Sequence, residues 1–263
     1  MSLGFRQSDI LEIARREGKV TVDGLAEQFG VTVQTIRRDL SELADAGHIS
    51  RVHGGAILSS GTTNLGYEDR RALHEAAKEA IAARCAEQIP DGAALFLSIG
   101  TSTEAVARAL SGHRGLLVVT NNMNVAHILA GHARAEVIVT GGTLRPHDGG
   151  LTGGLTNAAI RQFRFDIAVI GCSALDPGGD LLDFDHQEVE AGQTILAHAR
   201  RSFLVADHSK FSRAAPVRIA SLRDIDRFFT DLPPPAPLPR LCAQWRTEIV
   251  TAGSEEAPAG PAS

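Results

Sequence analysis

Two adjacent arginines stand in the stretch VQTIRRDL of a 263-residue chain whose formal net charge is −5. Arginine is the side chain that best recognises guanine edges and clamps phosphate, whereas glutamine suits adenine. Arg37 and Arg38 follow Gln34 within one helical turn, so a helix that turns these side chains to solvent would suit nucleic acid. Exposed arginines are also common on helices that bind nothing, so the pair needs support from the surrounding elements.

A second stretch, SIGTSTEAVARAL, has residue types that bind anions. Free N–H groups at the start of a helix, with hydroxyl groups beside them, form a ready anion site. The residues expected at that turn are Gly100, Thr101, Ser102 and Thr103. Lys210, in DHSKF, follows another apolar run and could supply a positive charge at the same edge of a sheet. Helix capping alone, and a solvated lysine, are the competing interpretations.

The third stretch, DLLDFDHQEVE, is rich in ionisable residues. They are Asp180, Asp183, Asp185, His186, Glu188 and Glu190. Such a set suits a metal ion or a carboxylate base, but a polar loop that leads into a helix is the favoured interpretation. The sequence contains no phosphate-binding loop of the GxxxxGK[ST] type, no nucleophile elbow and no zinc-ligand spacing. We therefore expect no catalytic residue, no cofactor and no metal.

Residues 1–58 have the pattern of short helices followed by a hairpin. Apolar residues recur at helical spacing in VTVDGLAEQFG, and Gly30 is placed to stop that helix. Thr32 is a suitable N-cap for a third helix, which Gly47 ends. HISRVHGGAIL has the alternation and the glycine pair of a small β-hairpin. Helix, turn, helix and hairpin together predict a winged helix-turn-helix.

The third helix explains the arginine pair. Ile36, Leu40 and Leu43 fall at i, i+4 and i+7 and form one buried stripe, which leaves the arginines on the exposed side. Residues 1–58 carry seven Lys or Arg against eight Asp or Glu, so contact with DNA must be local. The side chains that we expect at the DNA are Thr32, Gln34, Thr35, Arg37, Arg38, Ser41, Arg51 and His53.

Residues 59–75 are polar and are expected to form a linker. From 76 to 252, seven apolar runs alternate with helical stretches: ALFLSI, LLVV, EVIVTGG, FDIAVIG, SFLVAD, RFFTD and EIVTA. This alternation predicts an α/β domain with a mostly parallel sheet covered on both faces. Residues 253–263 have the composition of a disordered tail.

Composition narrows the class of protein further. No apolar run approaches the ~18 residues that a membrane span needs. Cys85, Cys172 and Cys242 are far apart and odd in number, which predicts reduced thiols in a cytoplasmic protein. A net charge of −5 argues against a non-specific DNA-coating protein, because such proteins are strongly basic.

The N-terminal domain resembles that of the DeoR-type bacterial transcriptional repressors, through LAEQFGV, TIRRDLSEL and the RxHGGA wing. Residues 76–252 resemble the sensor domain of the same family, through IGTSTEAVA, VTNNMNVA, LLDFDHQEV and VADHSKFSR. That domain is related to ribose-5-phosphate isomerase-type enzymes and binds phosphorylated sugars or polyols. The resemblance implies a dimeric or tetrameric repressor that binds double-stranded operator DNA and leaves it when an effector such as glycerol-3-phosphate binds.

The resemblance also implies which residues contact the effector: Lys78, Gly100, Thr101, Ser102, Thr103, Asp183, Glu188 and Lys210. Two positions depart from the family pattern. Ser98 stands where an aspartate commonly precedes the phosphate turn, and residues 190–193 lack the usual basic pair. We therefore expect weaker binding or a preference for another phosphorylated polyol. The alternative function is an isomerase-like enzyme with an accessory DNA-binding domain, in which Asp183, Asp185 or Glu188 would act as the base.

Overall fold

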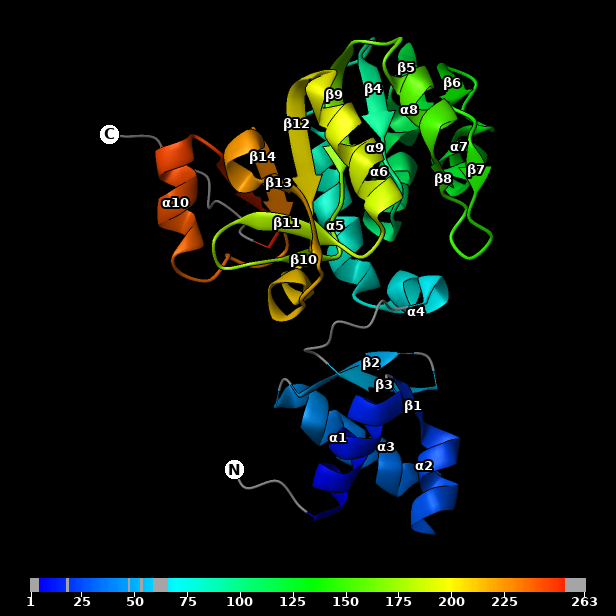
Figure 1. Cartoon of the computed structure of the whole chain (residues 1–263), viewed down its shortest axis with the longest axis vertical. Coiled ribbons are helices and arrows are strands. Elements are labelled where there is room, and N and C mark those ends of the chain that lie inside the picture. Colours follow the sequence, from blue (N-terminus) through cyan, green and yellow to red (C-terminus); the bar gives the residue numbers. More distant parts are fainter. Residues whose placement is uncertain (1–4, 18, 47, 53, 59–65, 254–263) are drawn as a thin grey trace, which may run out of the picture.

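A computed structural model describes residues 5–17, 19–46, 48–52, 54–58 and 66–253 of the chain. Figure 1 shows two bodies, a small N-terminal domain and a larger α/β domain. The N-terminal domain contains helices α1 (Phe5–Glu17), α2 (Val22–Phe29) and α3 (Val33–Asp45). A three-stranded sheet completes it, in the order β1-β3-β2, and the expected winged helix-turn-helix is confirmed.

The turn between α2 and α3 is set by two local features, a glycine that ends α2 and a threonine that caps α3. Gly30 adopts φ 62°, a left-handed conformation that ends α2 without strain. Thr32 then begins α3, because its Oγ1 accepts a hydrogen bond from the Thr35 N–H at 3.2 Å. Ile36, Leu40 and Leu43 are fully buried, as the stripe predicted. α3 is therefore held by one face and exposes the other.

The wing consists of β2 (Ile49–Val52) and β3 (Gly55–Leu58), and β1 (Lys19–Thr21) pairs with β3. Its glycine pair has a physical reason. Gly54 takes φ 73°, and a Cβ on Gly55 would lie 1.9 Å from the backbone oxygen of Val20. Only glycine fits at this position, because the backbone of β1 lies so close to that of β3.

The larger domain is built on a seven-stranded sheet in the order β15-β14-β12-β9-β4-β5-β6, and every pair in it is parallel. The strands are β4 (Ala94–Leu97), β5 (Leu116–Thr120), β6 (Ala135–Val139), β9 (Phe165–Ile170), β12 (Ala199–Val205), β14 (Arg227–Thr230) and β15 (Glu248–Thr251). Each overlaps one of the seven apolar runs, so the predicted mostly parallel sheet is confirmed.

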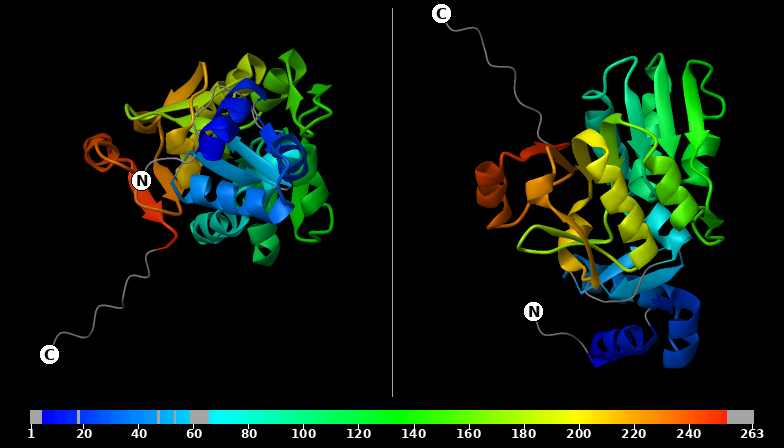
Figure 2. Two further views of the ribbon diagram at one scale, coloured as in Figure 1. Left: turned by 90° about the horizontal axis from the view of Figure 1, so that it is seen from below. Right: turned by 45° about the horizontal axis from the view of Figure 1, so that its top comes forward.

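Helices cover both faces of this sheet (Figure 2). One face packs on α5 (Glu75–Ala86), α6 (Thr101–Ala109) and α7 (Met123–Leu129). The other packs on α8 (Gly154–Ile160), α9 (His186–Ala197) and α10 (Leu238–Trp245). Five phenylalanines are among the largest fully buried side chains, and they come from β4, β9, β12 and β14. Two apolar layers therefore fix the sheet on both sides.

Short elements at the carboxyl ends of the parallel strands were not expected. A second, antiparallel sheet has the order β10-β11-β13, formed by β10 (Ala174–Leu175), β11 (Asp180–Asp183) and β13 (Val217–Ser221). A hairpin joins β7 (Thr143–Leu144) to β8 (Leu151–Thr152). The described residues also contain the 3₁₀ turns η1 (Leu110–Gly112), η2 (His208–Ser212) and η3 (Leu222–Asp224).

Part of the segment that we expected to be a linker is a helix, α4 (Tyr67–Ala72). The sequence hid it because none of its six residues is fully buried, so it lacks an apolar stripe. Residues 59–65 and the expected tail from 254 lie outside the described residues. Of the helices in the described part of the chain, none is long and apolar enough to span a membrane.

Candidate functional site

The exposed face of α3 carries the residues expected at DNA. Gln34, Arg37 and Arg38 are exposed, and Thr32 is exposed at the helix start. Arg38 has 83% of its side chain exposed and pairs with Glu42 one turn along, Nε to Oε1 at 3.0 Å. An exposed pair of this kind is weak, so a phosphate or a base edge can displace Glu42 from Arg38.

The wing and α3 are joined by a direct hydrogen bond. Arg51 Nη1, on β2, donates to Ser41 Oγ on α3 at 2.9 Å. Thr35 and Ser41 are partly exposed, and Thr35 takes part in the N-cap of α3. Seven of the eight residues expected at DNA thus lie on α3, at its start or on β2. The eighth, His53, falls outside the described residues.

A partly buried ion pair that we did not predict lies beneath this face. Asp39 on α3 is only 7% exposed, and both of its carboxylate oxygens accept from the guanidinium of Arg6 on α1. A two-pronged contact of this type fixes orientation as well as distance. It therefore sets the rotation of α3, and with it the direction of Arg37 and Arg38. The acid lies on the apolar side of the helix, which is the signal that could have revealed it.

In the α/β domain, a small cavity opens at the carboxyl ends of β4 and β9. This edge of a parallel sheet is where ligands bind. Its lining residues are Arg70, Ile99, Gly100, Thr101, Ser102, Gly171, Cys172, Ser173, Asp183, Glu188 and Lys210. Six of the eight residues expected at the effector are therefore in this lining.

The other two expected residues have structural roles. Thr103 is fully buried, and its Oγ1 lies 2.7 Å from the carbonyl oxygens of both Ser98 and Gly100. Lys78 donates from Nζ to the carbonyl oxygens of Arg70 and Leu73 at the end of α4. Burial and the nearby Lys210 together lower the pKa of Lys78 to about 8. Thr103 and Lys78 are therefore not in the cavity lining, and their side chains bind backbone carbonyl oxygens instead.

Several guanidinium nitrogens near this cavity lack hydrogen-bond partners among the described residues. Arg70 Nε and both Nη atoms of Arg213 are buried without a hydrogen-bond partner among the described residues. Burial lowers the pKa of Arg213, and the electrostatic repulsion of Arg70 adds to that effect. Buried polar groups in proteins are almost always hydrogen-bonded, so these guanidinium nitrogens without a partner indicate a missing acceptor. An anion with several oxygens meets that need.

The turn before α6 offers further donors. Gly100 has φ 139°, a conformation that side-chain-bearing residues rarely adopt. It opens a nine-residue helix whose first N–H groups have no partner within the helix. Lys210 lies across the cavity on η2, and burial lowers its pKa while Asp207 opposes that shift. Amides, hydroxyls and cations therefore line the same cavity.

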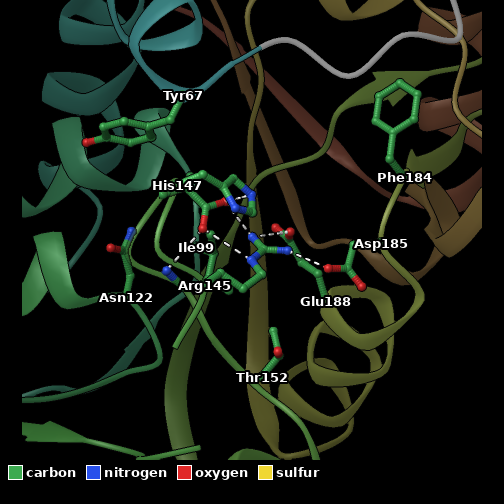
Figure 3. A network of polar contacts seen from close by, with 12 residues as sticks. Tyr67, Ile99, Asn122, Arg145, His147, Thr152, Phe184, Asp185 and Glu188 are labelled. Carbon is green, nitrogen blue, oxygen red and sulfur yellow. Dashed lines mark hydrogen bonds and ion pairs between the residues drawn. The ribbon is translucent and has the colours of Figure 1, made fainter. Parts of the chain in front are cut away.

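The acidic stretch around α9 holds an arginine that the sequence did not single out. Figure 3 shows Arg145 between the 145–150 loop and the first turn of α9. Its guanidinium lies 2.8 Å from Asp185 Oδ2 and 2.7 Å from Glu188 Oε2. Its Nε donates to Asp148 Oδ1 at 3.1 Å. The described residues contain no group of three His, Cys, Asp or Glu side chains arranged to hold a metal.

Two carboxyl groups of the site differ sharply in protonation. Burial and the neighbouring Asp183 together raise the pKa of Glu188 to about 7, despite the opposing effect of Arg145. For Asp207, burial raises the pKa, but Lys210 and the Ser209 hydroxyl bring it down to about 2. Glu188, in the cavity lining, is thus partly neutral near pH 7, whereas Asp207, beside Lys210, stays ionised.

α4 is attached to the site by its side chains. Tyr67 donates from its hydroxyl to Glu104 Oε2 at 2.8 Å. Glu104 is 2% exposed, and its other oxygen accepts from Asn122 at 3.3 Å and from Asn124 at 3.0 Å. Arg70 reaches Asp148 Oδ2 at 3.4 Å. These contacts place Arg70 in the cavity wall and tie α4 to α6 and α7.

A winged helix with an exposed arginine face, joined to an α/β domain with a cationic cavity, defines the class of ligand-responsive DNA-binding regulators. Two family profiles match the chain: the DeoR-like helix-turn-helix domain over residues 6–62, and the DeoR C-terminal sensor domain over residues 73–232. The chain belongs to the DeoR family of transcriptional regulators, as its motifs predicted. Homologues named as transcriptional repressors show that this function, and not the isomerase alternative, fits the chain.

Several curated proteins are similar over most of their length. The glycerol-3-phosphate regulon repressor of Escherichia coli (strain K12) is 46% identical over 88% of this chain and 91% of its own. Its counterpart in Haemophilus influenzae is 43% identical over 89% and 91%. The E. coli repressor CsqR is 40% identical over 93% and 94%.

Among solved structures, a D-ribose-5-phosphate isomerase in complex with phospho-erythronic acid is 16% identical and covers 52% of this chain and 54% of its own, with a TM-score of 0.40. The eIF2B delta subunit from Chaetomium thermophilum is also 16% identical, over 61% and 57%, with a TM-score of 0.46.

Proposed function

We propose that this protein represses a carbohydrate or glycerol catabolic operon in the cytoplasm, and that a phosphorylated metabolite such as glycerol-3-phosphate releases it from its operator. The observation that carries the effector part is the set of unpartnered guanidinium atoms on Arg70 and Arg213 beside the cavity. A phosphate monoester supplies several acceptor oxygens and negative charge, which those atoms lack. The relatives named for glycerol-3-phosphate support the choice of first candidate.

Coupling between the two domains is assigned to α4. Arg70 lines the cavity, and its carbonyl oxygen accepts from Lys78 Nζ and lies 3.4 Å from Thr101 Oγ1. An anion bound at Arg70 changes the balance between this arginine and Asp148, and α4 is the first described element after the winged helix. A coupling free energy of about 1–3 kcal/mol would change operator occupancy between severalfold and about a hundredfold.

The operator is expected to contain two half-sites related by a two-fold axis. A single recognition helix contacts few base pairs, so winged helices of this type act in pairs. The protein is therefore proposed to bind as a homodimer or homotetramer assembled through the sensor domain.

Fluorescence anisotropy with an operator selected from random DNA tests the repressor proposal. Glycerol-3-phosphate should raise the Kd for the operator at least fivefold, whereas free glycerol at the same concentration should leave it unchanged. Release by both compounds, or by neither, would contradict a phosphate-reading sensor. Turnover of a panel of sugar phosphates, assayed with the same preparation, should be absent, and measurable isomerisation would favour the enzymatic alternative.

A further inference from the structure

A second chamber adjoins the cationic cavity. It shares Ile99, Gly171 and Glu188 with that cavity and so lies directly behind them. Its remaining lining residues are Ser98, Asn121, Ile170, Ala191, Gly192, Ile195 and Ile219. Glu188 is the one charged residue in this lining, and no lysine or arginine of the described chain belongs to it. The second chamber is therefore largely apolar and carries no positive charge.

Asn121 gives this chamber a polar requirement. The side chain is 1% exposed, and its Nδ2 donates to the carbonyl oxygen of Leu151 at 3.1 Å. A carbonyl oxygen only accepts, so this bond fixes which way the amide faces. Asn121 Oδ1 is then left buried with no hydrogen-bond partner among the described residues. A buried acceptor of this kind needs a donor from whatever occupies the chamber.

Ser98 and Gly192 are small residues in the lining of the second chamber. Ser98 is uncharged, and Gly192 has no side chain. A Cβ on Gly192 would lie 3.2 Å from Ile219 Cγ2, so a larger residue would intrude on the space. Small, neutral residues thus keep the chamber open.

We propose that the effector spans both chambers, with its phosphate in the cationic cavity and a neutral, hydroxyl-bearing end in the second chamber, where Asn121 Oδ1 accepts a hydrogen bond from that hydroxyl. This inference rests on the proposed effector site and adds the class of ligand. A phosphorylated polyol fits, because its hydroxyl donates. A phosphorylated carboxylate does not, because its second negative charge would face the Asn121 acceptor, and no lysine or arginine of the described residues belongs to the lining of this chamber.

Two compounds differ only in the group that tests this idea. Glycerol-3-phosphate ends in CH₂OH, and 3-phosphoglycerate has the same skeleton with a carboxylate in that place. Titration calorimetry on the full chain should give a Kd for glycerol-3-phosphate at least about tenfold lower than for 3-phosphoglycerate. Inorganic phosphate, which fills the cationic cavity alone, should bind more weakly than glycerol-3-phosphate.

Two variants separate the chambers. Asn121→Ala removes the acceptor, and Gly192→Val fills the space beside Ile219. Each should raise the Kd for glycerol-3-phosphate at least about fivefold while leaving that for inorganic phosphate within about twofold, which also shows that the cavity is folded. Gly154→Val is the matched control, because nothing lies within 4 Å of a Cβ at that position. It should change neither constant.

The outcomes distinguish this inference from the proposed function. If inorganic phosphate and glycerol-3-phosphate both fail to bind, the effector site itself is wrong and the inference falls with it. If both bind but 3-phosphoglycerate binds as tightly as glycerol-3-phosphate, the cationic cavity stands and the neutral chamber is disproved. Unchanged glycerol-3-phosphate binding in both variants would likewise overturn the inference alone.

Discussion

At the scale of single residues, the two arginines of α3 are not equivalent. Arg38 pairs with Glu42, whereas Arg37 is exposed and has no ion pair among the described residues. Arg37→Ala should therefore weaken operator binding by about 1–3 kcal/mol if Arg37 reads a base. Arg84→Ala is the control, because Arg84 is also an exposed arginine but lies on α5 of the α/β domain, where it pairs with Glu87. Equal losses for both variants in anisotropy would remove Arg37 from the interface.

Glu188 predicts a pH dependence of stability. Its pKa is raised to about 7 in the folded protein, so the stability that its neutral form contributes is full below about pH 4.5 and is lost as pH rises through about 7. Relative to Glu188→Gln, the wild-type free energy of unfolding should fall by about 1–3 kcal/mol between pH 5 and pH 8. Urea unfolding of both proteins measures this difference, and parallel pH profiles would contradict the burial argument.

At the scale of elements, α4 presents two neighbouring arginines with different surroundings. Arg70 lines the cavity, whereas Arg71 is exposed. Arg70→Ala should raise the Kd for inorganic phosphate at least about tenfold, because a charge-assisted contact is lost. The backbone contacts of Lys78 with α4 do not depend on this side chain, so the helix should remain in place. Arg71→Ala should stay within about twofold, and an equal loss in both would refute the role of Arg70.

At the scale of the whole molecule, the winged helix and the sensor domain have separate cores. Ile10, Leu25, Ile36 and Leu40 belong to one cluster of buried residues, and the sheet of the α/β domain has two of its own. A fragment of residues 1–58 should therefore fold but bind the operator at least about tenfold more weakly than the full chain, because it lacks the second half-site. Tight binding by this fragment would contradict assembly through the sensor domain.

Local sequence determined much of the protein. Each parallel strand corresponds to an apolar run, because a strand buried on both faces needs apolar side chains throughout. The caps at Gly30 and Thr32 and the stripe of α3 depend on neighbours within a few residues, so they could be read directly. The motif residues Gly100–Thr103 could be recognised in the sequence for the same reason.

Only the tertiary structure decided how the cavity is completed. Arg70 lines it, Arg145 pairs with Glu188 of the lining, and Arg213 lies near Arg70. The three come from segments far apart in the chain, and none of them stands in a recognisable local pattern. It also removed Lys78 and Thr103 from the lining, because their polar groups satisfy backbone carbonyls. Burial, pairing and protonation depend on which segments meet at the sheet edge. That meeting is a property of the packed fold, and no spacing along the sequence encodes it on its own.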